Sequence, residues 1–192
     1  NDLFEHLGLP VPAKYPNCKY PIIVKPDNQS GSLNVFKAFS RYEAEGIAAA
    51  MAGKAVMQEY MDGRSFSIEV LGDGERFYLP EITEVITDES YDCKRIVSPA
   101  KISKQLKEKF LEMARIIAGA LKINGIFDIE VIENNGTLRL LEIDARFPSQ
   151  TPISVYHSSG INMVQVLVEI ALGTFHEMRR TENQVCCYQQ IV

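Results

Sequence analysis

Residues 127–146 read FDIEVIENNGTLRLLEIDAR, and this stretch contains more information about the fold than any other. Two runs that alternate apolar and acidic residues flank an Asn-Asn-Gly sequence, which predicts a β-hairpin. An isolated ionised carboxylate is costly to bury, so acids inside apolar strands must be paired, protonated or bound to cations. Mg²⁺ is commonly held by carboxylates together with the phosphates of a nucleotide. The hairpin therefore makes phosphate chemistry the first hypothesis.

The faces of this hairpin depend on the length of its turn. Side chains alternate along a strand, so Asp128 shares a face with Glu130, and Glu142 shares a face with Asp144. A longer, three-residue loop at 134–136 sets Asp128 opposite Glu142 and puts all the acids on one side. A tighter turn puts the two pairs on opposite faces. We predict the longer loop, or a bulge that restores the parity; the alternative is an edge hairpin whose polar face is solvated.

The composition indicates a globular chain with an acidic balance. The chain has 192 residues, of which 46% are hydrophobic, a net charge of −5 and a pI near 5.3. This charge disfavours binding to nucleic acid, which normally needs a basic face. The apolar stretch 163–172 is too short to cross a bilayer and no signal peptide is predicted, so we expect no membrane partner. The four cysteines form neither zinc-type pairs nor a disulfide framework, which favours a reduced, cytoplasmic protein: Cys18, Cys93, Cys186 and Cys187.

Hydrophobic periodicity and turn residues predict the remaining elements. Ser103 is placed to cap a long amphipathic helix, with apolar residues at helical spacing from Leu106 to Leu121 and Asn124-Gly125 at its end. The chain opens on what resembles a helix end at 3–7 and lacks an initiating methionine, so we expect a fragment. We further expect strands at 21–25, 55–57, 65–70 and 76–86, helices at 41–53 and 161–172, and polar loops at 27–32, 91–99 and 147–152.

Five short motifs, in chain order, resemble the ATP-grasp superfamily of carboxylate–amine ligases. They are a strand-ending lysine at Lys25, a Gly/Ser loop at 30–32, a hinge that ends at Gly63, the segment 91–94, and the hairpin from Glu130 to Arg146. The similarity extends from Leu3 to about Gly173. Within the superfamily, residues 142–162 are most similar to the branch that joins 3-methylornithine to lysine in pyrrolysine biosynthesis.

The resemblance implies an α+β ATP-grasp fold, in which ATP lies between two lobes of antiparallel sheet with packed helices. Residues 21–62 would form the small lobe and residues 63–180 the large lobe of one ATP-grasp domain. Residues 1–20 would be a linker and helix end after an absent N-terminal domain. Residues 181–192 would be a C-terminal segment or the start of a further small domain.

The resemblance also implies which residues bind the nucleotide. Lys25 would contact its phosphates. The Gly/Ser loop would cover the γ-phosphate as a mobile flap through Ser30, Gly31 and Ser32. The hinge would hold the adenine through the backbone groups of Gln58, Glu59, Tyr60 and Met61.

The residues of the reaction centre follow from the same resemblance. Glu130 and Glu142 would bind Mg²⁺, with Asp144 at a position where many members carry asparagine. Lys94 is similar to the second phosphate-side lysine of the D-alanine ligase branch, and Arg146 to the arginine that steadies the transferred phosphate. The candidates that would grip ammonium or carboxylate groups of the substrate are Asp128, Glu84 and Ser149.

Two features depart from the family pattern. Ser65 stands where members commonly carry a ribose-binding glutamate, and Glu59 or Asp62 are the candidate replacements. The family's first phosphate-contacting lysine and its Rossmann-like substrate domain precede the segment where this chain begins. His157 is interpreted as a loop histidine satisfied by the backbone rather than as a general base.

The implied activity is ATP- and Mg²⁺-dependent amide formation through an acyl phosphate. The substrates would be small-molecule amino acids, and no protein nucleophile is required. By resemblance, the carboxylate belongs to 3-methylornithine and the attacking amine is the ε-amine of lysine. A homodimer is a further expectation. Three alternatives stay open: another amino-acid or dipeptide ligase of the D-alanine ligase type, a non-catalytic ATP-binding module, and a site for divalent cations alone.

Overall fold

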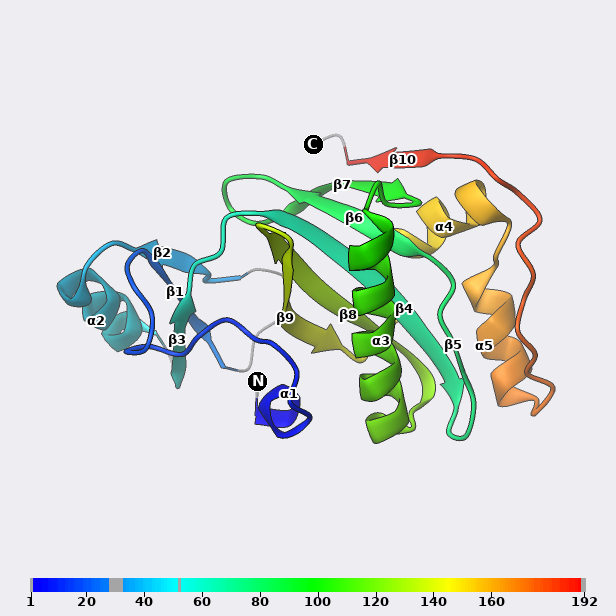
Figure 1. Cartoon of the computed structure of the whole chain (residues 1–192), viewed down its shortest axis with the longest axis horizontal. Coiled ribbons are helices and arrows are strands. Elements are labelled where there is room, and N and C mark those ends of the chain that lie inside the picture. The colour runs from blue at the N-terminus through cyan, green and yellow to red at the C-terminus, as the bar shows by residue number, and fades with distance from the viewer. Residues whose placement is uncertain (1, 28–32, 52, 191–192) are drawn as a thin grey trace.

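The computed structural model describes residues 2–27, 33–51 and 53–190, and it shows a small and a large sheet (Figure 1). The small sheet has three strands in the order β2-β1-β3, and the large sheet has seven, in the order β10-β7-β6-β4-β8-β9 with β5 paired to β4. The pairings between these strands are antiparallel, so the expected α+β fold with two antiparallel lobes is confirmed. In chain order the elements are α1 (Asp2–His6), β1 (Ile22–Pro26), β2 (Phe36–Ala38), α2 (Arg41–Ala50), β3 (Ala55–Glu59), β4 (Arg64–Asp73), β5 (Phe77–Tyr78), β6 (Ile82–Thr87), β7 (Cys93–Ser98), α3 (Lys104–Leu121), β8 (Asn124–Asn134), β9 (Thr137–Asp144), α4 (Thr151–Ser159), α5 (Met163–Ala171) and β10 (Cys186–Gln189).

The small lobe is built on a short apolar core between β1 and α2. Ile22 and Val24 are fully buried and pack with Ala44 of the helix. Because side chains alternate along β1, Ile23 and Lys25 point to the opposite face, toward the large lobe. The helix ends at Ala50, three residues before the predicted end at 53. The alternation along β1 therefore places Lys25 in the space between the lobes.

One face of the large sheet packs against α3. Phe66 and Ile68 of β4 and Phe127 and Ile129 of β8 are buried in this core with Phe110 of the helix. These β4 and β8 residues lie on one face because Phe66 pairs with position 131 and Ile68 with Ile129. The neighbouring residues in both strands therefore project to the other face, which carries the acids.

The structure confirms the predicted start of α3 and corrects its end. Ser103 Oγ accepts a hydrogen bond from Leu106 N at 3.3 Å, as expected of a helix cap. The helix ends at Lys122, which has a left-handed φ of 47°. Asn124-Gly125, the predicted end signal, instead begins β8, because this strand continues to pair with β4 as far as Asn124.

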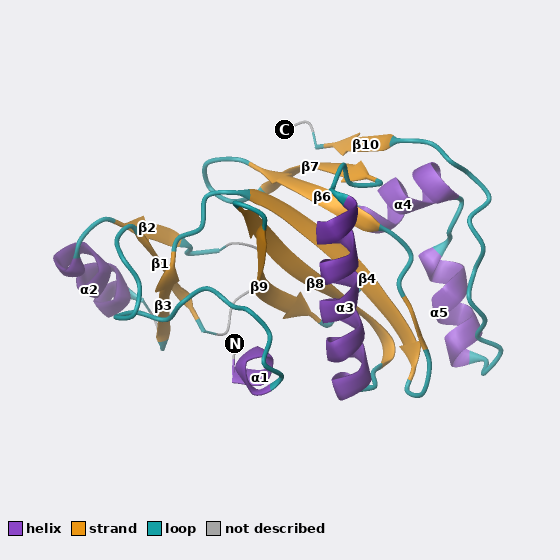
Figure 2. Cartoon of the chain, in the orientation of Figure 1, coloured by secondary structure: helices purple, strands orange, loops and turns teal. Residues whose placement is uncertain are grey.

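The helices α4 and α5 cover one end of the opposite face of the sheet (Figure 2). Leu71 of β4 packs there against Val155, Met163 and Val166. The helix α5 lies within the predicted range 161–172, whereas α4 was not predicted, since its first residues were assigned to a loop. The sequence of α4 does not predict a helix, because it contains Pro152, which a helix tolerates only in its first turn, and β-branched residues, which have a lower helix propensity.

The acid-bearing hairpin has a tight turn and a bulge. Asn134 pairs with Thr137, and the turn residues Asn135 and Gly136 have φ values of 50° and 77°. The predicted longer loop is therefore wrong. The predicted alternative is confirmed, since the register shifts between Glu130 and the next residue of β8 and leaves Leu141 as an extra residue in β9.

The bulge sets the final pairing of the acids. Glu130 lies opposite Glu142, and Asp128 lies opposite Asp144 rather than opposite Glu142 as the longer loop predicts. All these acids share the face away from α3. The acids therefore share one face, as predicted, and the bulge is what puts them there.

Both ends of the chain contact the large lobe. Phe4 and Leu9 are buried in the core beneath α3. The segment 93–98, predicted as part of a polar linker, forms β7, and β10 pairs with it at the sheet edge. Among the described residues, no helix is long and apolar enough to cross a membrane.

Candidate active site

A narrow, largely apolar cavity of about 160 Å³ lies between the two lobes. Ile23 and Lys25 of β1 line it from the small lobe, together with residues 58–61, the predicted adenine-binding segment. Val85, Ile132 and Leu141 line it from the large lobe. Apolar walls with a cation at one end suit a flat heterocycle that carries phosphates.

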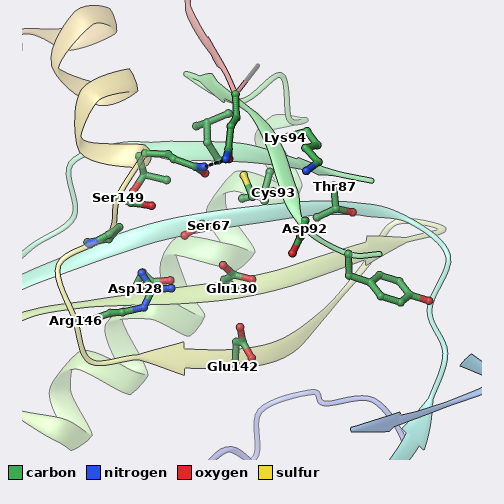
Figure 3. Close-up of a pocket in the computed structure, with 17 residues that line it drawn as sticks. Ser67, Thr87, Asp92, Cys93, Lys94, Asp128, Glu130, Glu142, Arg146 and Ser149 are labelled. Atoms are coloured by element: carbon green, nitrogen blue, oxygen red, sulfur yellow. Dashed lines mark hydrogen bonds between the residues drawn. The ribbon is translucent and has the colours of Figure 1, made fainter. Parts of the chain in front are cut away.

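A second, more polar cavity of about 350 Å³ continues from the first over the large sheet (Figure 3). The two cavities share the lining residues Val85, Thr87, Tyr91, Glu130 and Glu142, so they form one cleft. Most of the predicted reaction-centre residues line the second cavity: Lys94, Asp128, Glu130, Glu142, Arg146 and Ser149.

Glu130 and Glu142 lie side by side on adjacent strands, as Figure 3 shows. Residues paired directly across antiparallel strands have Cβ atoms about 4.5–5.5 Å apart, which brings the two carboxylates within reach of one ion. Ser67 lies next to Glu130 on the other side, on β4. The register of three strands therefore fixes this part of the site on rigid backbone.

The environment of the acids favours their neutral forms in the absence of a cation. Burial, followed by the charge of Glu142, raises the pKa of Glu130 to about 8. Burial and then the charge of Glu69 raise the pKa of Asp128 to about 7. Burial also raises the pKa of Glu142, although the positive charge of Lys25 opposes this. A bound cation would reverse these effects, since it favours the ionised carboxylates.

Three positive side chains surround the acids. Lys25 acts on Glu142 from the small lobe, and Arg146 donates a hydrogen bond to Asp144 Oδ2 at 2.7 Å. Lys94 lies 3.3 Å from the carboxylate of Asp88. These cations come from separate elements and face one cleft, which is a suitable arrangement for the oxygens of a polyphosphate.

The metal prediction fits the site in part. Within the described ranges, no group of three His, Cys, Asp or Glu side chains could hold a metal ion by itself. Asp144 is held by Arg146 and lines a different opening of about 760 Å³, on the side of α1. Glu130 and Glu142 still suit Mg²⁺, which commonly takes one or two carboxylates and completes its shell with phosphates and water. This donor set argues against the alternative of a cation site that works without a nucleotide.

Glu84, a predicted substrate-binding residue, is not in the cleft. It pairs with Phe66, so its side chain projects to the α3 face. There it accepts hydrogen bonds from Arg64 at 2.7 and 2.8 Å. The alternation of β6 is clear in the sequence, but the pairing with β4 decides which face each residue takes.

The remaining predicted residues have different surroundings. Ser65 lines the smaller cavity. Glu59 lines that cavity too, but its Oε2 accepts a hydrogen bond from Ala13 N at 3.1 Å. His157 lies in the helix α4, not in a loop as predicted, and it is not among the residues that line the cleft. The flap residues Ser30, Gly31 and Ser32 lie outside the described residues.

Sequence reasoning missed two residues near Asp128: Thr151, which lines the cleft, and Glu69, which is buried behind the lining. Glu69 of β4 is completely buried beside Asp128, and burial raises its pKa to about 7. Its signal was present, because Ser65-Phe66-Ser67-Ile68-Glu69-Val70 is another alternating strand with an acid. Thr151 begins the unpredicted helix α4 and lines the cleft.

Comparison with known proteins agrees with this geometry. A family model described as the ATP-grasp domain matches residues 1–150, so the chain belongs to the ATP-grasp family. The chain is 36% identical to the 3-methyl-D-ornithine–L-lysine ligase of Methanosarcina barkeri (strain Fusaro / DSM 804), over 100% of this chain and 50% of that protein. The chain therefore spans about half the length of the curated relatives it matches.

Solved structures show the same fold. The biotin carboxylase domain of the Hydrogenobacter thermophilus 2-oxoglutarate carboxylase, a dimer in complex with MgADP, ADP and bicarbonate, superposes with a TM-score of 0.80 at 15% identity. That match covers 95% of this chain and 45% of the other. An L-amino acid ligase from Bacillus licheniformis superposes with a TM-score of 0.74 at 22% identity, over 89% of this chain and 45% of that one.

Proposed function

We propose that this chain is the nucleotide-binding and catalytic part of an ATP-dependent ligase. The ligase forms an amide bond between the carboxylate of an ornithine derivative and the ε-amine of lysine. The observation that carries the proposal is the direct pairing of Glu130 with Glu142 in a cleft that also holds Lys25. The MgADP of the H. thermophilus enzyme supports the nucleotide and the metal. The name of the M. barkeri relative, at 36% identity, supports the two substrates.

The residues of the cleft suit a reaction that concentrates negative charge. Bound MgATP would supply the γ-phosphoryl group that converts a carboxylate into an acyl phosphate, with ADP as the leaving group. An amine would then attack the acyl carbon and displace phosphate, which forms the amide. Glu130 and Glu142 would hold the Mg²⁺, with Asp144 beside them and oriented by Arg146. Lys25, Lys94 and Arg146 would stabilise the phosphoryl oxygens from separate sides.

The two connected cavities would hold different parts of the substrates. Residues 58–61 and the apolar walls of the smaller cavity would hold the adenine, with Ser65 near the ribose in place of an acid. The larger cavity would hold the amino acid, with Ser149 as a hydrogen-bonding group for it. A cleft that closes over the activated acid excludes water, which would otherwise hydrolyse it.

Several features of the whole protein belong to the same proposal. We propose that the substrate domain implied by the resemblance precedes residues 1–20; the relatives, about twice as long as this chain, leave room for such a domain. The acidic charge of −5 supports a protein without a nucleic-acid partner. The four cysteines are all free, which supports the reducing cytoplasm. The exposed apolar residues Val164 and Val168 of α5, with Leu172 at its C-cap, suit a homodimer contact, which light scattering would test.

The test follows ADP and phosphate release by the longest natural form that contains this chain, with ATP, Mg²⁺ and a panel of amino acids. We expect release only when an ornithine derivative and lysine are both present. Glu142→Gln should abolish it, whereas Glu84→Gln, which makes the same change on the opposite face, should leave it intact. Release with D-alanine, or equal activity of the Glu142→Gln variant, would contradict the proposal.

A further inference from the structure

The loop that joins β6 to β7, residues 88–92, lies where the two cavities of the cleft meet. Tyr91 lines both cavities and Asp92 lines the larger one, whereas Asp88 is not among the lining residues of either. Oδ1 of Asp88 accepts hydrogen bonds from the backbone N of Ser90 at 2.8 Å and of Asp92 at 3.1 Å. The backbone N of Asp88 donates in turn to the carbonyl oxygen of Asp92 at 3.0 Å. The loop is therefore closed on itself, with Asp88 at its base.

Lys94 reaches the larger cavity at a bulge in β7. Thr87 pairs with Cys93 and Ile86 pairs with Arg95, so Lys94 is an extra residue in the strand. Successive side chains of a strand normally point to opposite faces, but here Cys93 and Lys94 both line the larger cavity (Figure 3). The bulge therefore turns a flexible, positively charged side chain toward the cavity.

The larger cavity offers acidic partners to Lys94, and it pairs with an acid outside the cavity lining. Glu130 and Glu142 line the cavity, and burial, followed by the charge of Glu130, raises the pKa of the neighbouring Cys93. Nζ of Lys94 instead lies 3.3 Å from Oδ2 of Asp88, and no other acid in the described part of the chain forms an ion pair with it. Asp88 thus holds the loop with one carboxylate oxygen and the lysine with the other.

This choice of partner matters for the proposed metal site. An ammonium group and Mg²⁺ compete for the same carboxylate oxygens, because both are attracted there by charge. A lysine that paired with Glu130 or Glu142 would therefore oppose the binding of the metal ion. An ammonium group has three N–H donors, so the ion pair with Asp88 leaves donors of Lys94 for phosphoryl oxygens.

We propose that Asp88 is a positioning residue that holds Lys94 away from the metal-binding acids and available to the phosphoryl oxygens. This inference rests on the proposed function and deepens it, because Asp88 acts through Lys94 and does not touch the nucleotide. The side chains of the pair are 36% and 34% exposed, and ion pairs of this kind contribute little to stability. The role of Asp88 therefore lies in the site and not in the stability of the fold.

The test measures the affinity for MgADP, by isothermal titration calorimetry, of the longest natural form that contains this chain. Asp88→Asn keeps an oxygen that can accept the hydrogen bonds of the loop, and it removes the charge that holds Lys94. We expect this variant to bind MgADP about tenfold more weakly, because the released lysine competes with Mg²⁺ for Glu130 and Glu142. Asp88→Ser removes the same charge and should give the same result.

A second comparison separates positioning from a structural role. In a protein that already carries Lys94→Met, Asp88→Asn should have no further effect on the affinity for MgADP, since no ammonium group is released. Glu89→Gln is the matched control, because Glu89 is an exposed acid of the same loop that is not among the lining residues of the cleft. This control should keep the wild-type affinity. The melting temperature of Asp88→Asn should stay within about 2 °C of the wild-type value.

Unchanged or tighter binding of MgADP by Asp88→Asn would overturn the proposal. An equal loss of affinity with and without Lys94→Met would show that Asp88 only orders the loop, and it would overturn its action through the lysine. Failure of the proposed function has a different signature: the wild-type protein would release no phosphate with any pair of amino acids, while the pattern of MgADP affinities stayed as expected.

Discussion

The crowding of acids on one face of the large sheet predicts that the metal-free protein loses stability as the pH rises. Glu130, Asp128 and Glu69 have raised pKa values of about 8, 7 and 7 in the fold. Between the ordinary pKa of these acids and the raised one, the folded chain holds protons that the unfolded chain has released. Stability therefore falls as the pH rises through this window, roughly from 4 to 8.

The size of the effect follows from Asp128, which is 4% exposed. A rise of its pKa from 3.8 to about 7 corresponds to about 4 kcal/mol, since one pKa unit is about 1.4 kcal/mol. About half of this, roughly 2 kcal/mol, is lost between pH 5.5 and the raised pKa. For a domain of this size, each kcal/mol changes the melting temperature by about 2–4 °C, so we expect a decrease of about 4–8 °C between pH 5.5 and pH 8.5. Asp73, whose pKa is lowered to about 2 by Arg76, contributes in the opposite sense, but only below about pH 4.

Differential scanning calorimetry in EDTA over this pH range measures the effect. Addition of MgADP should raise the melting temperature more at pH 8.5 than at pH 5.5, because cations bind the ionised carboxylates. Glu130→Gln should make the pH profile less steep, because one of the three acids is removed, and Glu84→Gln, on the other face, should leave it unchanged. A melting temperature that is constant or rises from pH 5.5 to 8.5 in EDTA would refute the reasoning.

Two further predictions concern residues that do not line the cleft. Gly63, between β3 and β4, has no room for a side chain, because an added Cβ would lie 1.9 Å from the backbone oxygen of Glu133. Gly63→Ala should therefore lower the free energy of unfolding, measured in urea, by about 1–3 kcal/mol. Gly46→Ala in α2, where nothing lies within 4 Å of the added Cβ, should instead stabilise the fold by about 0.5–1 kcal/mol, and equal effects of the two variants would contradict this. Arg180 forms an ion pair with the buried Glu81, so Arg180→Met should lower the free energy of unfolding by about 2 kcal/mol in the same assay. Adding Glu81→Gln to this variant should recover most of the loss. Full additivity of the two substitutions would argue against the ion pair.

The sequence predicts the acid face because alternation along a strand is local. Asp128 and Glu130 must share a face whatever the rest of the chain does, and the same holds for Glu142 and Asp144. It does not predict which residues oppose each other, since the bulge at Leu141 depends on packing against β8. Residue pairing across strands is therefore where the prediction for Asp128 was wrong.

The misplacement of Glu84 and the omission of Glu69 have one common cause. Both acids lie in alternating strands, and the local pattern does not show which of them projects to the face of the sheet that carries the cleft. The pairing of Phe66 with Glu84 and of Glu69 with Asp128 separates them, and these contacts join residues far apart in the chain. A long-range register, which a single sequence does not reveal, thus decides whether an acid binds arginine on the α3 face or faces the cavity.

The extra residue in β9 links the tight turn to the chemistry. With a two-residue turn and no bulge, Glu142 and Asp144 would project into the apolar core beneath α3, where ionised acids are costly. Leu141 restores the parity, so that Glu142 faces Glu130, and it also lines the smaller cavity of the cleft. One inserted residue therefore aligns the two carboxylates and supplies an apolar wall beside them. The acids are tolerated on this face because the cleft beside it is open to cations that the core would exclude.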